Sequence, residues 1–162
     1  MRAVARRRPP LPSHNRDIDD ADTALRNATY QQYAATGRVP SVGVIAAATG
    51  LSDGDVIAGW RRLHDAHALV LDGDALRMLN PFSLIRTAHR VTTGGRFWYA
   101  NCAWDAFGVC SALRTPGRIE TRCPDCSASL VIDSDDDSAT TRSLVFHSLV
   151  PARRWWDDIV FT

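Results

Sequence analysis

Cys102 and Asp105 stand three residues apart in the run NCAWD. On a helix, residues at this spacing share a face, so the Asp105 carboxyl can lie beside the Cys102 sulfur and exchange a proton with a group that the sulfur holds. Thiolates bind soft metal ions, which makes Cys102 a candidate ligand and nucleophile. The structural alternative is that Cys102 is a small buried side chain and Asp105 a first-turn carboxylate favoured by the helix dipole.

Asn101 is predicted to be the N-cap of the helix that carries this pair. The β-forming residues at 97–99 follow a glycine pair and predict a strand, and the run 102–113 is compatible with a helix. Cys102 would then lie in the first turn. There the unpaired backbone N–H groups and the helix dipole would lower the pKa of its thiol.

Cys123 and Cys126 form a second thiol group, spaced as C-x-x-C. This spacing fits a turn with ordinary thiols, a zinc site, or an auxiliary thiol pair for soft metals. A structural zinc ion needs four ligands, and Cys110 and His147 could complete a set only if the fold brought them there. The first interpretation is therefore favoured. Cys110 is interpreted as a buried residue and His147 as a strand histidine, while Trp155-Trp156 is interpreted as core or cleft wall.

The composition is that of an ordinary folded protein. The 162 residues are 45% hydrophobic and 23% charged, which suits one domain or two small ones that share a core. The net charge of +1 argues against a partner bound by bulk electrostatics. No apolar run is long enough to cross a bilayer, and the start lacks a signal-peptide pattern. We expect a cytoplasmic protein with reduced cysteines and no membrane partner.

Residues 1–20 and 21–80 differ in character. The first stretch is rich in arginine and proline and predicts a disordered tail, which is preferred over a nucleic-acid-binding arm because no aromatic residues are interleaved. The second predicts three helices, with stops at Gly37 and Gly50, and a hairpin around Asp72-Gly73-Asp74. Three helices followed by a hairpin predict a winged-helix-like domain.

A winged helix raises the question of DNA binding. The third helix offers Arg61, Arg62 and His64 as contacts to nucleic acid. It also carries three aspartates, and the hairpin tip is acidic, so this surface would repel phosphates. We therefore predict that the domain packs on the second half of the chain and that nucleic acid is not a partner.

The region 81–162 predicts strands around one embedded helix, so the fold class is α+β. The stretch 83–91 predicts a linker that passes into a strand, and 92–95 predicts a turn. Two strands are predicted at 118–122 and 129–133, with an acidic loop at 133–138. A buried strand at 143–150, a helical turn or short helix at 151–158 and the start of a last strand at 159–161 are predicted to follow.

The Cys102–Asp105 run resembles the core motif of the organomercurial (alkylmercury) lyase family, a Cys-x-x-Asp set at a helix start. The wider frame is similar too: Asn80-Pro81-Phe82-Ser83 precedes the motif, and Val150-Pro151-Ala152 and Trp155-Trp156 follow it. The resemblance covers roughly residues 22–162. It implies a winged-helix-like N-terminal domain without DNA binding and an alkylmercury-lyase-like catalytic domain over 81–162.

The activity that this resemblance implies is protonolysis of a carbon–mercury bond. Cys102 would hold the mercury as a thiolate, and Asp105 would carry the proton to the leaving carbon and then help hold the inorganic ion. Hg(II) would be the substrate and product metal, no cofactor would be required, and free cellular thiols would be partners.

The chain departs from the family in one respect. A second family cysteine is expected near residues 140–146, and this stretch contains none. Cys123 and Cys126, a free thiol, or a continuation of the protein beyond its apolar end at 159–162 could supply the missing sulfur. Two alternatives remain open, namely a thiophilic metal or small-ligand binder on the same scaffold and a metal-responsive DNA-binding regulator.

Overall fold

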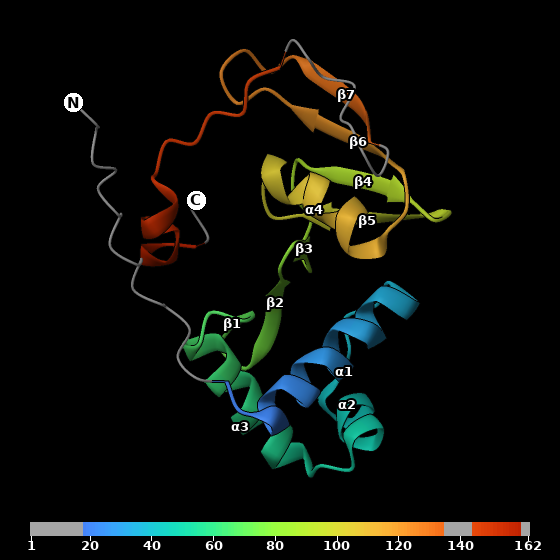
Figure 1. Cartoon of the computed structure of the whole chain (residues 1–162), viewed down its shortest axis with the longest axis vertical. Helices are drawn as coiled ribbons and strands as arrows, with labels where there is room; N and C mark the ends of the chain where they lie inside the picture. The colour runs from blue at the N-terminus through green and yellow to red at the C-terminus, as the bar shows by residue number, and fades with distance from the viewer. Residues whose placement is uncertain (1–17, 135–143, 160–162) are drawn as a thin grey trace, which may run out of the picture.

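The computed structural model describes residues 18–134 and 144–159 (Figure 1). Most of the predicted tail, most of the acidic loop and nearly all of the last predicted strand start lie outside these residues. The elements are α1 (Asp20–Thr36), α2 (Val42–Thr49), α3 (Asp53–Asp65), β1 (Val70–Asp72), β2 (Ala75–Leu79), β3 (Phe82–Ser83), β4 (Arg90–Thr93), β5 (Arg96–Ala100), α4 (Ala103–Leu113), β6 (Gly117–Arg122), β7 (Ser129–Ser134) and the 3-10 helix η1 (Ala152–Asp157).

The three N-terminal helices begin at residues whose side chains accept a hydrogen bond from the first turn. Asp19, Ser41 and Ser52 accept from the backbone N–H groups of Asp22, Val44 and Asp55. Gly37 and Gly50 end the first two helices in the left-handed conformation that favours glycine. The three predicted helices and their stops are therefore confirmed.

Strands β1 and β2 form the predicted hairpin, with Gly73 at positive φ in its turn. This hairpin is not a separate wing. β2 pairs with β3, β3 pairs with β5, and all strands of the described residues belong to one sheet of order β1-β2-β3-β5-β4-β6-β7. The sheet thus runs from the helical half into the second half of the chain (Figure 1). The α+β class is confirmed, whereas the winged-helix assignment and a domain division after residue 80 remain predictions.

One face of the sheet packs against α4. Trp98, Val91, Ile119 and Ile132 lie side by side across β5, β4, β6 and β7, and all four are buried. Ala106, Val109 and Cys110 bring α4 onto the same core, and all three are buried. Because α4 follows β5 directly, this packing fixes the start of the helix beside the C-terminal end of β5.

The stretch 83–91 is the predicted linker that passes into a strand, since β3 ends at Ser83 and β4 begins at Arg90. Two other expectations about the second half are wrong. The turn predicted at 92–95 contains only Gly94 and Gly95, because Thr92 and Thr93 belong to β4. The described part of 143–150 is not a buried strand either. Residues 144–150 have no regular structure, and Val145 and Leu149 are 89% and 81% exposed. This run lies beside α4 instead, where Phe146 packs on Trp104.

No single helix in the described part of the chain is long and apolar enough to cross a membrane. Helices α2 and α3 together reach the required length and composition, but they meet at an angle of 100°.

Candidate functional site

Cys102 itself is the N-cap of α4, and the prediction that Asn101 takes this position is wrong. Cys102 has extended backbone angles, φ −145° and ψ 178°, and its sulfur accepts a weak hydrogen bond from the backbone N–H of Asp105 at 3.4 Å. The thiol therefore lies at the mouth of the first turn rather than within it. Its sulfur faces the unpaired N–H groups directly.

Asn101 is unable to cap the helix because its side chain is engaged elsewhere. Its Nδ2 donates to Asn80 Oδ1 at 3.0 Å and, at 3.4 Å, to the carbonyl oxygen of Pro81. The peptide bond between Asn80 and Pro81 is cis, and Pro81 also lies against Gly108 of α4. These contacts join the β2–β3 turn to the start of α4, so two segments some twenty residues apart in the sequence form one site.

The pKa of the Cys102 thiol is raised, contrary to the prediction from its place in the chain. Burial is the largest cause, because the half-buried sulfur loses water that would stabilise its charged form. The backbone N–H groups of Asp105 and Trp104 act in the opposite direction, and the negative charge of Asp105 raises the pKa further. Cys102 is therefore a protonated thiol at neutral pH, and a metal must displace its proton.

Asp105 is also half-buried, and burial raises the pKa of its carboxyl group. Hydrogen bonds from the side chains of Asn101 and Cys102 lower this pKa and oppose the effect of burial. The Cys102 thiol and the Asp105 carboxyl are therefore in direct contact. A proton can pass between them without an intervening group.

The helical half contributes Tyr30 to the surroundings of the pair. The hydroxyl of Tyr30 donates to the carbonyl oxygen of Ala68 at 2.8 Å, and the guanidinium of Arg26 lies 4.2 Å from the centre of its ring. Burial raises the pKa of Tyr30, Arg26 opposes this, and the charge of Asp105 adds to the rise. Sequence reasoning missed Tyr30, because nothing in the pattern of α1 distinguishes it from other residues that pack inward.

The C-terminal segment lies beside the start of α4. Trp104, in the first turn of the helix, is 60% exposed and packs on Phe146 with ring centres 5.8 Å apart. Further along, Trp155 Nε1 donates to the carbonyl oxygen of Val150 at 2.8 Å, and Trp156 stacks on His67 at 4.1 Å. The prediction that the tryptophan pair belongs to the core is wrong, because both side chains are only half-buried. Their contacts instead hold the C-terminal segment together and join it to the helical half. The cleft-wall interpretation stays a prediction.

The remaining predicted ligands do not gather at Cys102. Cys110 is buried, as predicted, and His147 lies exposed in the irregular segment instead of in a strand. Cys123 is half-buried and Cys126 exposed, in the turn between β6 and β7. Within residues 18–134 and 144–159, no three His, Cys, Asp or Glu side chains come together as a metal would require, so a zinc ion at the C-x-x-C turn is not supported.

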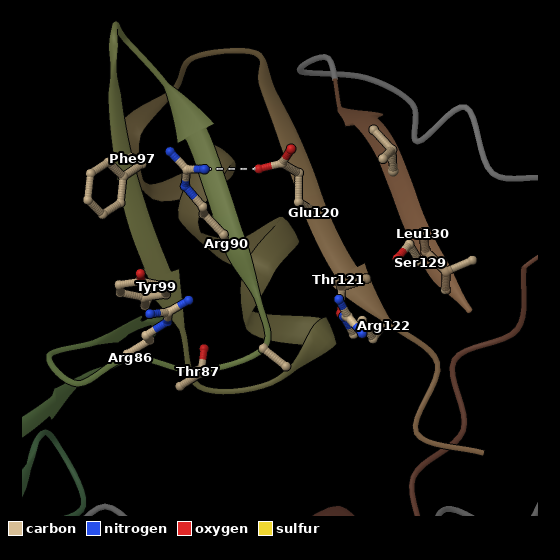
Figure 2. A pocket seen from close by; sticks show the side chains of 12 residues that line it. Arg86, Thr87, Arg90, Phe97, Tyr99, Glu120, Thr121, Arg122, Ser129 and Leu130 are labelled. Atoms are coloured by element: carbon tan, nitrogen blue, oxygen red, sulfur yellow. Dashed lines mark hydrogen bonds and ion pairs between the residues drawn. The ribbon is translucent and has the colours of Figure 1, made fainter. Parts of the chain in front are cut away.

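A shallow groove of about 650 Å³ lies on the other face of the sheet (Figure 2). Its lining is rich in basic and aromatic side chains: Arg86, Thr87, Ala88, Arg90, Phe97, Tyr99, Glu120, Thr121, Arg122, Ser129, Leu130 and Val131. Arg90 lies over the ring of Phe97 and pairs with Glu120 at 3.4 Å. The lining includes neither Cys102 nor Asp105, so the groove is separate from the thiol site. Its one sequence signal is the outward position of Phe97 and Tyr99 in a strand whose alternate residues are buried.

The geometry of the Cys102–Asp105 pair indicates the class of site. A half-buried thiol at a helix N-terminus, in contact with a carboxyl group of raised pKa, is a site where a soft metal can bind sulfur while a proton is exchanged beside it. A sequence model of the alkylmercury lyase (MerB) family matches residues 82–162. The chain therefore belongs to the alkylmercury lyase family.

The fold agrees with this membership. The chain is similar to a solved structure described as the mercury-bound form of MerB2, with a TM-score of 0.62 and 20% sequence identity. The match covers 79% of this chain and 63% of that one, so the chain spans less than two thirds of the length of the protein that it resembles. A comparison with curated proteins gives no match.

Proposed function

We propose that this protein cleaves carbon–mercury bonds by protonolysis, with Cys102 as the mercury ligand and Asp105 as the proton carrier. The contact between the half-buried Cys102 thiol and the Asp105 carboxyl at the start of α4, in a member of the alkylmercury lyase family, carries this proposal. Raised pKa values suit both roles. A protonated thiol brings the proton that the reaction consumes, and a carboxyl whose pKa is raised towards neutrality can both take up and release it.

The reaction balances with these two groups. An organomercury cation, R–Hg⁺, bonds to the Cys102 sulfur while the thiol proton moves to Asp105. Electron donation from sulfur weakens the mercury–carbon bond and makes the carbon more basic. Asp105 then delivers its proton to that carbon, R–H departs, and Hg(II) stays on Cys102 with the Asp105 carboxylate beside it.

A second sulfur on mercury has to come from outside this pair. Cys110 lies eight residues along the same chain segment, about 12 Å of axial rise on a helix, and its side chain is buried. The sulfurs of Cys102 and Cys110 are therefore too far apart to bind the same mercury ion. We propose that a free thiol in solution is the second ligand during cleavage.

The test is cleavage of phenylmercury or methylmercury by the wild-type protein, with release of benzene or methane as the readout. Cys102→Ser is expected to abolish organomercurial binding at the start of α4 and cleavage together. Asp105→Ala is expected to lower the cleavage rate by roughly 10²- to 10⁴-fold while it spares binding far better, because proton delivery is needed in the transition state. Asp65→Asn, at an exposed carboxyl in the last turn of α3, is the matched control and should act like the wild type.

Equal losses of binding and cleavage in Asp105→Ala would contradict the division of roles. A wild-type protein that binds organomercurials through Cys102 and never releases hydrocarbon would instead support the second candidate, a thiophilic binder on the same scaffold. The absence of the second family cysteine from 140–146 is the observation that favours this candidate.

The α3 side chains that could contact DNA all have hydrogen-bond or ion-pair partners within the protein. Arg61 pairs with Asp74 at 2.7 Å, Arg62 pairs with Asp22 at 2.6 Å, and His64 Nδ1 accepts from the backbone N–H of Leu71 at 3.2 Å. We therefore propose that α3 serves to pack the helical half and not to bind nucleic acid.

A further inference from the structure

The turn that connects β6 to β7 holds Cys123 and Cys126 in a defined conformation. The backbone N–H of Ser127 donates to the carbonyl oxygen of Cys123 at 2.9 Å, and the N–H of Cys123 donates to the carbonyl oxygen of Ala128 at 2.9 Å. Ser127 takes a positive φ of 59°, which closes the turn. Two thiols three residues apart are thus fixed on one tight turn before any ligand binds.

Polar groups of this turn converge on the Cys123 sulfur. The backbone N–H groups of Cys126 and Asp125 donate to it, and the Cys126 thiol contacts it. N–H groups aimed at a sulfur stabilise a thiolate, which is the form that binds metal. Cys126 is exposed, so an ion can reach the pair from solution.

The sheet places this turn at the same end of its strands as the Cys102 site. Arg90 of β4 pairs with Tyr99 of β5 on one side and with Glu120 of β6 on the other, so β5 and β6 run in the same direction. Cys102 follows Tyr99 by three residues, and Cys123 follows Glu120 by three. Their two strands are separated by β4 alone, a lateral distance of about 10 Å.

We propose that Cys123 and Cys126 form a second soft-metal site, a dithiolate that binds one ion in two-coordinate geometry. The ions that accept two sulfur ligands in a line are Hg(II), Cu(I) and Ag(I). Zinc requires four ligands, and the described residues offer no third or fourth side chain at this turn.

This site also suggests a path for the product, and this part rests on the proposed function. Hg(II) left on Cys102 moves to the turn by ligand exchange. The two cysteine thiols lose their protons to solvent, two sulfur–mercury bonds form, and the bonds of mercury to Cys102 and to its other ligand break, with no change of oxidation state. Cys102 regains a proton and is free for another substrate.

The experiment measures retention of inorganic Hg(II) by the reduced protein under anaerobic conditions, after gel filtration in excess glutathione. In the Cys102→Ser background the protein should keep one Hg(II), with sulfur–mercury absorption in the ultraviolet. Cys102→Ser/Cys126→Ser should lose it, because a chelate converted to a single thiolate competes with glutathione at least ~10²-fold less well. Cys126 is exposed, so this substitution leaves the packing intact, which circular dichroism checks.

Cys102→Ser/Cys110→Ala is the matched control, since it removes the buried thiol and should keep the ion. Retention that survives Cys126→Ser, or a Cys102→Ser protein that holds no mercury, would overturn the proposal. Failure of the proposed function looks different: the wild type would release no hydrocarbon from phenylmercury, while the Cys102→Ser protein would still retain inorganic Hg(II) on the turn.

Discussion

Asn101→Ala tests whether the site is positioned by the contact between the β2–β3 turn and α4. The substitution removes the 3.0 Å hydrogen bond to Asn80 Oδ1 and the longer one to the Pro81 carbonyl oxygen. Leaving partly buried acceptors without a donor costs ~1–3 kcal/mol. Asn101 Oδ1 is itself buried and has no hydrogen-bond partner among the described residues, so its removal offsets part of the loss. We expect a net destabilisation of about 1 kcal/mol, or ~2–4 °C in Tm for a chain of this length.

The same substitution should shift the pH dependence of cleavage in a defined direction. Asn101 donates a hydrogen bond that lowers the pKa of Asp105, and burial raises it. Without Asn101, the pKa of Asp105 rises further above its ordinary value. Asp105 has to be unprotonated to accept the proton of Cys102, so the acidic limb of kcat/KM moves to higher pH, and activity along this limb falls more than the small loss of stability explains.

The assay is thermal unfolding together with kcat/KM for phenylmercury between pH 5 and pH 9, compared with the wild type and with Asn27→Ala. Asn27 lies half-way along α1 on its exposed side and makes a matched control. A destabilised protein whose acidic limb stays in place would show that Asn101 is only structural. A limb that moves to lower pH would refute the assignment of Asp105 as the proton acceptor.

Three further outcomes are expected. Iodoacetamide should alkylate Cys102 more slowly than a free cysteine at pH 7, and Asp105→Asn should speed the reaction, because the Asp105 charge raises the thiol pKa; an unchanged rate would contradict this coupling. Arg61→Ala/Arg62→Ala should leave cleavage intact, and salt-dependent DNA binding that this variant loses would contradict a packing role for α3. Gly59→Ala should destabilise the protein by ~1–3 kcal/mol in chemical denaturation, because a Cβ there overlaps the buried side chain of Leu25; Gly43→Ala, where a Cβ meets nothing within 4 Å, is the control.

The local structure of the helical half could be predicted because its signals lie within a few residues of their effects. Ser41 and Ser52 cap the helices that follow them, and Gly37 and Gly50 end helices at positive φ. Capping and chain reversal depend on side-chain type and backbone freedom at one position, so the sequence carries them directly.

The start of α4 could be predicted only to within one residue, and the reason is tertiary. Asn101 is the better capping residue by type, but its amide is bound to Asn80, so the cap passes to Cys102. The sign of the Cys102 pKa shift was missed for the same reason. The effect of the helix N-terminus could be read from position, whereas the burial of Cys102 in the folded chain could not.

The exposed segment 144–150 shows a different limit. Its apolar residues have the composition of a buried strand, yet composition does not reveal whether a segment pairs with a strand of the sheet. Phe146 contacts Trp104 instead, so the apolar character of this stretch serves contact with the first turn of α4.

These corrections change how the chemistry should be understood. A thiol of lowered pKa would bind any soft metal at once, and the proton for the carbon would have to come from solvent. A thiol of raised pKa in contact with Asp105 keeps its proton until a metal displaces it, and the displaced proton stays on the carboxyl beside the bond that needs it. In the proposed reaction, the raised pKa of Cys102 thus slows metal binding and keeps at the site the proton that cleavage consumes. The Cys123–Cys126 turn differs in both respects: the pKa of Cys123 is lowered, and Cys126 is exposed to solvent. Both properties suit a site that accepts the ion. In this proposal the two thiol sites at the same end of the strands have separate roles. The half-buried Cys102 site breaks the bond to carbon, and the Cys123–Cys126 site takes up the metal.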